Sequence, residues 1–333
     1  MVLSRIVPNA SMADSLLAVD DLKDDFEKIL NWAIEFKKLW KSGDELALEF
    51  APLANMTVGS IYEKPSTRTR VSFEVGIDRL GGNPLTLLKN DIQLGTSETV
   101  ADTAAVLSRF LGAITYRCYS HDDVAELAAN SDVPVLNALS DKHHPCQAVA
   151  DLMTVMEHFP DREGLKIAWV GDGNNVLHDL LLAGVMLGID VSYAHPKGYE
   201  PADDVIARAH AIADETGAKI VATNDPVEAV SGANVIYTDV FVSMGEEGLK
   251  DKFAAFDGFQ VNMDLVANAS DKWTFMHCLP AHRGEEVTDA VMDHDNSIVF
   301  DQAENRMWGQ MSLLAYLVDP VGWETMGEFM GLV

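Results

Sequence analysis

Two arginines alternate with three hydroxyl residues in the sequence STRTR, at residues 66–70. The stretch VSFEVGIDRL that follows has helical periodicity and predicts a helix from about residue 70 to residue 80. The first turn of a helix offers unpaired backbone N–H groups and a positive dipole end, which attract anions. Arg68 and Arg70 add permanent charge, and Ser66, Thr67 and Thr69 add neutral donors. A capped helix with exposed charges is the alternative, but capping does not require this alternation, so STRTR predicts an anion site.

Further polar residues follow predicted strands, where parallel sheets form their ligand crevices. These residues are Asn174 and Asn175 in WVGDGNN, Asp239 and Ser243 in DVFVSMGEE, and Cys278 in TFMHCLP. The glycine-containing segment after Asp239 is a candidate lid. Cys278 has an equally supported alternative role as a small buried hydrophobe.

Two more motifs carry polar residues with open interpretations. KHHPCQ places His143, His144 and Gln147 at the start of a predicted helix, without the spacing of further ligands that a zinc site requires. Arg306 in QAENRMW is by default an exposed arginine, and only its neighbours argue otherwise. WVGDGNN resembles a dinucleotide-binding turn, but Val176 stands where a third glycine belongs and no acidic residue ends the next strand. A nicotinamide dehydrogenase is therefore the weakest interpretation.

Composition excludes several classes of protein. The chain has 333 residues with 52 Asp and Glu against 24 Lys and Arg, a net charge of −28, which argues against nucleic acid as a partner. No apolar run is long enough for a membrane span, and no secretory signal is visible at the start. Three cysteines without paired spacing suit a reducing compartment, so we expect a cytoplasmic protein. The acidic excess is tolerable at high external salt, which makes a salt-adapted source plausible.

Strand-like and helix-like segments alternate along the chain in two sets. The first set runs from LANMTVGSIY to VPVLNAL, and the second from LKIAWVG to TFMHCLP, with a hinge near the helix at 148–159. Apolar residues at helical spacing within residues 16–40 predict an amphipathic helix, with a shorter turn before it at Leu16 and Leu17 as an alternative for those two residues. A last helix is predicted at SLLAYLV. The predicted fold class is therefore α/β, with two domains that are each a parallel β-sheet flanked by helices.

Five motifs together resemble one known family. STRTR, HPCQ, DVFVSMG, HCLP and AENR occur in the order found in the transcarbamylase superfamily, and within it in the ornithine carbamoyltransferases. The resemblance runs from about residue 10 to residue 315. STRTR and HPxQ are shared across the superfamily and mark carbamoyl phosphate, whereas SMG and HCLP indicate ornithine rather than aspartate. GDGNN and NDIQLG also resemble the ornithine enzymes.

The resemblance implies an architecture. Residues 1–150 would bind carbamoyl phosphate, residues 151–310 would bind ornithine, and a C-terminal helix at about 311–333 would pack back on the first domain. It further implies a homotrimer with active sites between subunits and with no metal or organic cofactor, and it leaves open whether trimers assemble further.

The resemblance also implies roles for individual residues. The phosphate group would be held by Ser66, Thr67, Arg68 and Thr69, with Gln93 reaching in from a neighbouring subunit. The carbamoyl group would be held by Arg117, His144 and Gln147. The ornithine positions would be Asn175, Asp239, Ser243 and Met244, and the site would be completed by Cys278, Leu279 and Arg306. The expected catalytic residues are Arg117, His144, Cys278 and Asp239.

The implied reaction is attack of the side-chain amine of L-ornithine on carbamoyl phosphate, which gives L-citrulline and phosphate in arginine metabolism. Two alternatives remain. One is a related transcarbamylase that acts on another amine, such as acetylornithine or putrescine, and Ser243-Met244-Gly245 counts against it. The other is a non-catalytic ligand-binding paralogue, which would not need the full set of donors.

Overall fold

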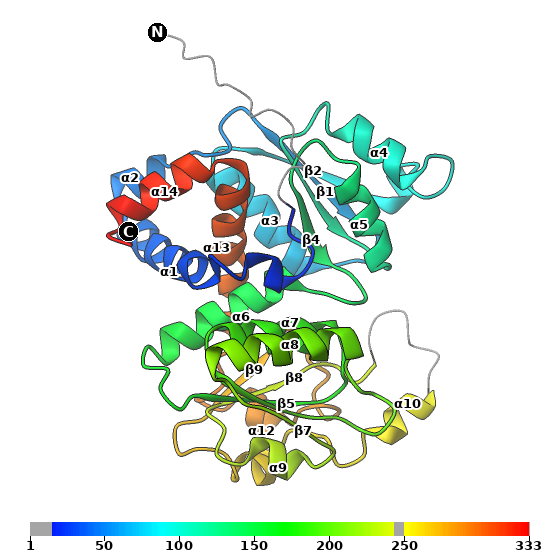
Figure 1. The fold of residues 1–333 in the computed structure, drawn as a ribbon, viewed down its shortest axis with the longest axis vertical. Helices are drawn as coiled ribbons and strands as arrows, with labels where there is room; N and C mark the ends of the chain where they lie inside the picture. Colours follow the sequence, from blue (N-terminus) through cyan, green and yellow to red (C-terminus); the bar gives the residue numbers. More distant parts are fainter. Residues whose placement is uncertain (1–14, 243–249, 333) are drawn as a thin grey trace.

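The computed structural model describes residues 15–242 and 250–332. Figure 1 shows two lobes, each built on its own sheet. Both sheets are parallel and are flanked by helices, which confirms the predicted fold class. No helix within the described ranges combines the length and the apolar character needed to cross a membrane.

The first sheet has the strand order β2-β1-β3-β4. Its strands are β1 (Thr57–Tyr62), β2 (Asn83–Leu88), β3 (Ala113–Arg117) and β4 (Val135–Leu139), and they are connected through α3 (Thr67–Arg79), α4 (Val100–Leu107) and α5 (His121–Ala129). Every residue of β3 is buried, as expected for a strand in the middle of a parallel sheet with both faces covered. The chain leaves β1 toward β2 on one side and returns to β3 on the other, so a crevice opens beyond the ends of β1 and β3.

The second sheet has the order β7-β6-β5-β8-β9. Its strands are β5 (Lys166–Val170), β6 (Asp190–Ala194), β7 (Ile220–Thr223), β8 (Val235–Thr238) and β9 (Thr274–His277). Its helices are α7 (Asn175–Met186), α8 (Asp203–Thr216), α9 (Pro226–Val230), α10 (Lys250–Ala255), α11 (Met263–Val266) and α12 (Asp289–Met292). The strand order reverses between β5 and β8, so this sheet has its own crevice beyond the ends of those two strands.

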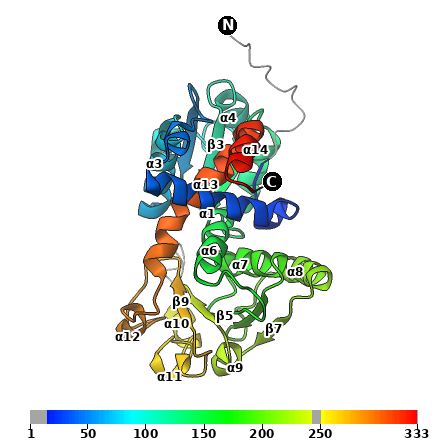
Figure 2. The ribbon, with the colours of Figure 1, turned by 90° about the vertical axis from the view of Figure 1, so that its left-hand side faces the viewer.

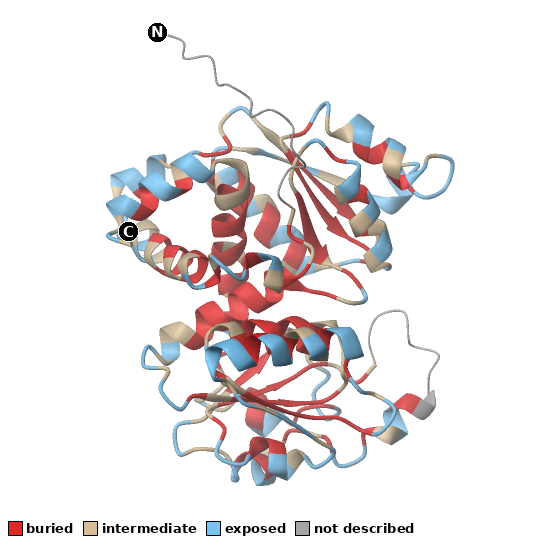
Figure 3. Cartoon of the chain, in the orientation of Figure 1, coloured by how far each residue is buried: buried red, intermediate tan, exposed pale blue. Residues whose placement is uncertain are grey.

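Two helices join the lobes. α6 (Pro145–His158) follows the last strand of the first sheet, and α13 (Val299–Val318) runs from the lower lobe into the upper one, as Figure 2 shows. The two helices pack against each other, and α13 also packs against α1 (Phe26–Ser42) and α3. Most of α6 is buried, which Figure 3 shows as a red band between the lobes. α3, the helix at whose start STRTR lies, therefore packs on α13, and α13 also contacts β9 of the second sheet.

The C-terminal helices enclose an aromatic cluster. Trp32 stacks on Phe36 with ring centroids 4.6 Å apart, and its indole N–H donates to the backbone oxygen of Trp323 at 3.0 Å. Trp323 lies on α14 (Pro320–Phe329), which packs on α13. Aromatic side chains of this size contribute large apolar areas to a core, so this cluster anchors the end of the chain to the first domain.

The last helix differs from its sequence prediction. We expected a helix at SLLAYLV, preceded by the connecting stretch VFDQAENRMWGQ, but α13 includes that stretch and begins at residue 299. The reason is that Gln302, Asn305 and Arg306 are buried, so the helix has no simple apolar stripe. A 3-10 turn, η1 (Val19–Leu22), precedes α1, whereas Leu16 and Leu17 lie before that turn and outside any helix. Short elements without a sequence signal were also missed, namely α2 (Glu45–Glu49), η2 (Lys89–Asp91) and α10 to α12.

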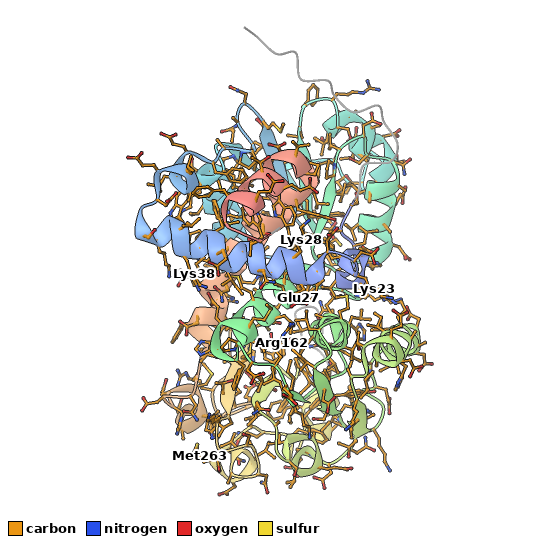
Figure 4. The ribbon with its side chains drawn as sticks, turned by 60° about the vertical axis from the view of Figure 1, so that its left-hand side comes forward. Lys23, Glu27, Lys28, Lys38, Arg162 and Met263 are labelled. Carbon is orange, nitrogen blue, oxygen red and sulfur yellow. The ribbon has the colours of Figure 1, made fainter. Side chains whose placement is uncertain are left out.

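Ion pairs cross the boundary between the lobes. The ammonium of Lys23 lies 2.6 Å from a carboxylate oxygen of Glu215, and Arg162 donates to Glu27 on α1. Figure 4 places Glu27 and Arg162 on the two sides of this boundary. Exposed pairs of this kind are worth up to about 1 kcal/mol each, so the buried helix contacts carry most of the attachment.

Candidate functional site

The two crevices face a single cavity of about 330 Å³ between the lobes. The loop after β1 and the end of β3 contribute from the first domain, and the start of α7 and the loops after β8 and β9 contribute from the second. The predicted site residues that line the cavity are Ser66, Thr67, Arg68, Thr69, Arg117, His144, Gln147, Asn175, Asp239, Cys278, Leu279 and Arg306. Gln93 is exposed and does not line it, and Ser243 and Met244 lie outside the described residues.

The start of α3 separates the two arginines of STRTR. Ser66 is extended and caps the helix, with its hydroxyl accepting from the backbone N–H of Thr69 at 3.2 Å. Arg68 is half-buried and lines the cavity. Arg70 is exposed, and its Nε lies 2.9 Å from a carboxylate oxygen of Glu74 one turn later. Arg68 is thus available to a ligand, whereas Arg70 stabilises the helix.

Two further guanidinium groups meet at the bottom of the cavity. Arg117 is buried at the end of β3, and burial together with the nearby Arg306 lowers its pKa to about 10, so it stays charged at neutral pH. Arg306 donates to Gln147 Oε1 and, at 3.3 Å, to Thr69 Oγ1. The Nε atoms of Arg117 and Arg306 have no hydrogen-bond partner. Within the described ranges, neither these two arginines nor Arg68 forms an ion pair with a carboxylate.

His144 lies beside this positive cluster as the residue that precedes α6. The side chain is buried, and its Nδ1 has no hydrogen-bond partner. Burial first, and then the charges of Arg306 and Arg117, hold its pKa well below the usual histidine range. The imidazole is therefore neutral, and it can donate one hydrogen bond without adding a fourth charge to the cluster.

The opposite wall of the cavity carries an acid and a thiol. Cys278 Sγ donates to Asp239 Oδ1 at 2.9 Å, and the side-chain amide of Asn174 donates to Asp239 Oδ2 at 2.9 Å. Burial and the neighbouring Asp239 raise the pKa of the thiol well above its usual value. Cys278 is thus a protonated hydrogen-bond donor rather than a thiolate nucleophile.

The ligating atoms of Asp239, His277 and Cys278 also lie close enough together to suggest a metal site. Both ring nitrogens of His277 are already engaged, Nε2 with Glu286 at 3.0 Å and Nδ1 as acceptor from the backbone N–H of Leu279. The donors of this group are therefore hydrogen-bonded to neighbouring side chains and backbone. They fit a metal ion poorly.

A buried acid beneath the cavity escaped the sequence analysis. Asp151 accepts from Gln147 Nε2 and from Gln302 Nε2, each at 2.7 Å, and from the hydroxyl of Tyr237 at 3.1 Å. Burial raises the pKa of Asp151 to about 6 and outweighs the three hydrogen bonds, which lower it. The four-residue spacing from Gln147 along the same helix was the available signal. Asp151 fixes the amide of Gln147, so that its oxygen faces Arg306.

Lys64 was also missed. It lies just before STRTR in the sequence, and it is buried and lines the cavity, with its ammonium 4.6 Å from the ring centroid of Tyr119. Burial lowers its pKa, and so does Arg117. The cavity thus gathers positive charge from a fourth side chain.

A helix N-terminus with buried arginines, set across an interdomain crevice from an acid and a thiol, defines a two-domain α/β transferase of the transcarbamylase class. Comparison with family models agrees with this class. Residues 14–157 match the model described as "Aspartate/ornithine carbamoyltransferase, carbamoyl-P binding domain", and residues 163–317 match "Aspartate/ornithine carbamoyltransferase, Asp/Orn binding domain". The chain belongs to the aspartate/ornithine carbamoyltransferase family.

Individual relatives are similar over nearly their whole lengths. The chain is 48% identical over 304 residues to "Ornithine carbamoyltransferase, catabolic" of Thermoplasma volcanium, covering 91% of this chain and 98% of the relative. It is 51% identical over 289 residues to "Ornithine carbamoyltransferase, anabolic" of Pyrococcus furiosus, covering 86% and 92%. The solved structure of ornithine carbamoyltransferase from Pyrococcus furiosus superposes with a TM-score of 0.86 at 49% identity, covering 92% of this chain and 97% of that one.

Replacing Arg68 with Ala is expected to weaken binding of carbamoyl phosphate roughly 10- to 100-fold, because it removes a charge-assisted donor from a partly buried anion site. Arg70→Ala is the matched control, since Arg70 is exposed and paired with Glu74. Isothermal titration calorimetry measures both dissociation constants. Equal dissociation constants for the two variants would show that Arg68 does not contact carbamoyl phosphate.

Replacing Asp151 with Asn is expected to change how stability depends on pH. The folded protein holds a proton on Asp151 that the unfolded chain releases from about pH 4 upward, so this carboxyl lowers the free energy of unfolding as the pH rises from 4 to about 6. The free energy of unfolding of the wild type minus that of Asp151→Asn should fall by about 3 kcal/mol over this range, since a tenfold change in proton affinity is worth ~1.4 kcal/mol. Urea unfolding between about pH 4 and pH 7 measures it. A difference that does not vary with pH contradicts the assignment.

Proposed function

We propose that the protein transfers the carbamoyl group of carbamoyl phosphate to the side-chain amine of L-ornithine, giving L-citrulline and phosphate. The observation that carries this proposal is a set of three guanidinium groups, Arg68, Arg117 and Arg306, that line the cavity without an ion pair to any carboxylate of the described residues. Buried charges without partners are costly, so this arrangement needs an anionic ligand. The relatives that are similar over nearly the whole chain are named ornithine carbamoyltransferases, which selects ornithine as the acceptor.

In this proposal the first substrate binds along the helix start. The phosphate oxygens are held by Arg68, by the hydroxyls of Ser66, Thr67 and Thr69, and by the N–H groups of the first turn of α3. The carbamoyl oxygen accepts from Arg117 and His144, and the carbamoyl NH₂ donates to Gln147. Gln147 is already oriented by Asp151 and Arg306, so it needs little reorganisation when substrate arrives.

The amine of ornithine approaches from the wall formed by Asp239 and Cys278. An alkylammonium has a pKa of about 10.4 in water, so the site must favour the neutral amine or accept its proton before attack. Asp239 already accepts from Cys278 and Asn174, and an incoming N–H becomes a further donor to the same carboxylate. Asn175, Ser243 and Met244 are the further positions proposed for ornithine, and Leu279 completes the site.

Attack of the amine nitrogen on the carbonyl carbon forms a C–N bond and moves an electron pair onto the carbonyl oxygen. Arg117, His144 and Thr69 stabilise this charge, and one preorganised donor of this kind is worth about 3 kcal/mol. When the carbonyl re-forms, the C–O bond to phosphate breaks and the bonding pair leaves with the phosphate. The amine proton is lost to the site or to solvent.

Assembly, domain roles and location belong to the same proposal. Gln93 is exposed on its own subunit, which suits a residue supplied to a neighbouring site in a homotrimer. Residues 1–150 with the C-terminal helix would serve carbamoyl phosphate, and residues 151–310 would serve ornithine. The cysteines Cys118, Cys146 and Cys278 are all free, which fits the reducing cytoplasm expected from the sequence.

Turnover with a panel of amines tests the proposal. We expect citrulline from carbamoyl phosphate and ornithine. Carbamoylation of acetylornithine, putrescine and aspartate should be slower by at least about 100-fold, because the parts of these molecules that differ from ornithine leave polar groups of the site unpaired. Colorimetric detection of each carbamoylated product measures the rates. Preferred use of another amine would make the substrate assignment wrong, and no reaction with any amine would favour a ligand-binding paralogue.

A further inference from the structure

One buried carboxylate lies outside the reaction chemistry and yet contacts a catalytic residue. Asp179 is on α7 in the second domain, and its side chain is fully buried. Its Oδ2 accepts from the backbone N–H of His144, and its Oδ1 accepts from the backbone N–H of Val19 and faces His143 Nδ1, each at 3.0 Å. All three partners precede or begin elements of the first domain, so Asp179 is a contact between the domains.

The contact continues to the surface through an arginine. One guanidinium nitrogen of Arg208 on α8 lies 3.0 Å from His143 Nε2, and another donates to both carboxylate oxygens of Asp20, at 2.7 and 2.6 Å. The contacts therefore form a chain that starts at the carboxylate of Asp20 and runs through the guanidinium of Arg208 and the imidazole of His143. It ends at the carboxylate of Asp179 and the backbone N–H of His144. Charges of opposite sign alternate along it, which offsets the cost of burying Asp179.

The arginine fixes the tautomer of His143. A guanidinium can only donate, so His143 Nε2 must accept, and the ring proton must lie on Nδ1. That proton then points at Asp179 Oδ1. Asp179 Oδ1 therefore accepts from both Val19 and His143, and Oδ2 is the acceptor for His144.

We propose that Asp179 is a positioning residue for the carbamoyl transfer, with His143 and Arg208 holding its carboxylate in place. It acts through the backbone N–H of His144, at the point where α6 begins, and so sets the place of the His144 imidazole and of Gln147 one turn further on. This inference rests on the proposed function. It adds that the second domain orients the donors to the carbamoyl oxygen, and that the two domains must stay joined here for turnover.

The Asn variant cannot reproduce these contacts. If the amide oxygen of Asp179→Asn faces His144, its NH₂ group meets both the N–H of Val19 and the Nδ1–H of His143. If the amide is turned, its NH₂ group meets the N–H of His144. At least one buried donor therefore loses its acceptor in either orientation, although the volume is unchanged. Asp203→Asn is the matched control, because it removes the same charge from an exposed position on the neighbouring helix α8.

Steady-state kinetics of the full-length protein test the inference. Asp179→Asn should lower kcat per folded molecule by about tenfold or more, with KM for ornithine changed less than about twofold, because the lost contact acts on the carbonyl donors. His143→Phe, which leaves the carboxylate but removes its imidazole partner, should lower kcat by a smaller factor. Asp203→Asn should match the wild type. Circular dichroism and unfolding midpoints report the folded fraction.

Three outcomes overturn the inference. The first is an equal kcat in Asp179→Asn and Asp203→Asn. The second is an effect of Asp179→Asn that is as large on KM for ornithine as on kcat, and the third is a decrease in kcat that disappears once rates are normalised to folded protein. If Asp179→Asn does not fold, wild-type kcat in His143→Phe overturns it instead. If the wild type does not use ornithine, the proposed function fails separately. The inference is then tested by the affinity for carbamoyl phosphate, which Asp179→Asn should weaken and Asp203→Asn should not.

Discussion

An excess of positive charge inside the cavity is the constraint on which the rest of the structure depends. Arg68, Arg117 and Arg306 converge at the start of α3 without carboxylate partners among the described residues, and Lys64 adds a fourth cation. Taking several charges out of water is costly unless hydrogen bonds and an opposite charge offset it. The neutral imidazole of His144 and the proton on the thiol of Cys278 both limit the further charge that the cavity must hold.

The two-domain architecture supplies the rigid frame that such a cluster requires. Each parallel sheet reverses its strand order at one point, and the loops from both points meet at the same cavity. Below it, Asp151, Gln302 and Tyr237 join α6, α13 and β8 through buried hydrogen bonds. Satisfied buried networks hold their side chains in one arrangement, which favours preorganised donors. A net charge of −28 repels anions at long range, so capture of an anionic substrate must depend on this short-range site.

The sequence predicted the fold class and the family because both depend on local patterns. Strand and helix periodicities gave the two alternating sets, and the motifs lie at loops whose backbone geometry is local, such as the cap at Ser66. It could not predict α13 as one long helix, since Arg306 and Gln302 are buried only through contacts with distant elements. Asp179 and Lys64 were missed for the same reason, since their partners come from other elements of the fold. Asp151 has one partner on its own helix, Gln147, but its burial depends on contacts with Gln302 and Tyr237 of distant elements.

A crystal structure with a non-hydrolysable phosphonate analogue of carbamoyl phosphate tests the central claim most directly. We predict that the phosphonate oxygens lie within hydrogen-bond distance of Arg68 and of the first backbone N–H groups of α3, and that the carbonyl oxygen lies between Arg117 and His144. A phosphonate bound away from the start of α3, or a carbonyl that faces Asp239 instead, would contradict this account.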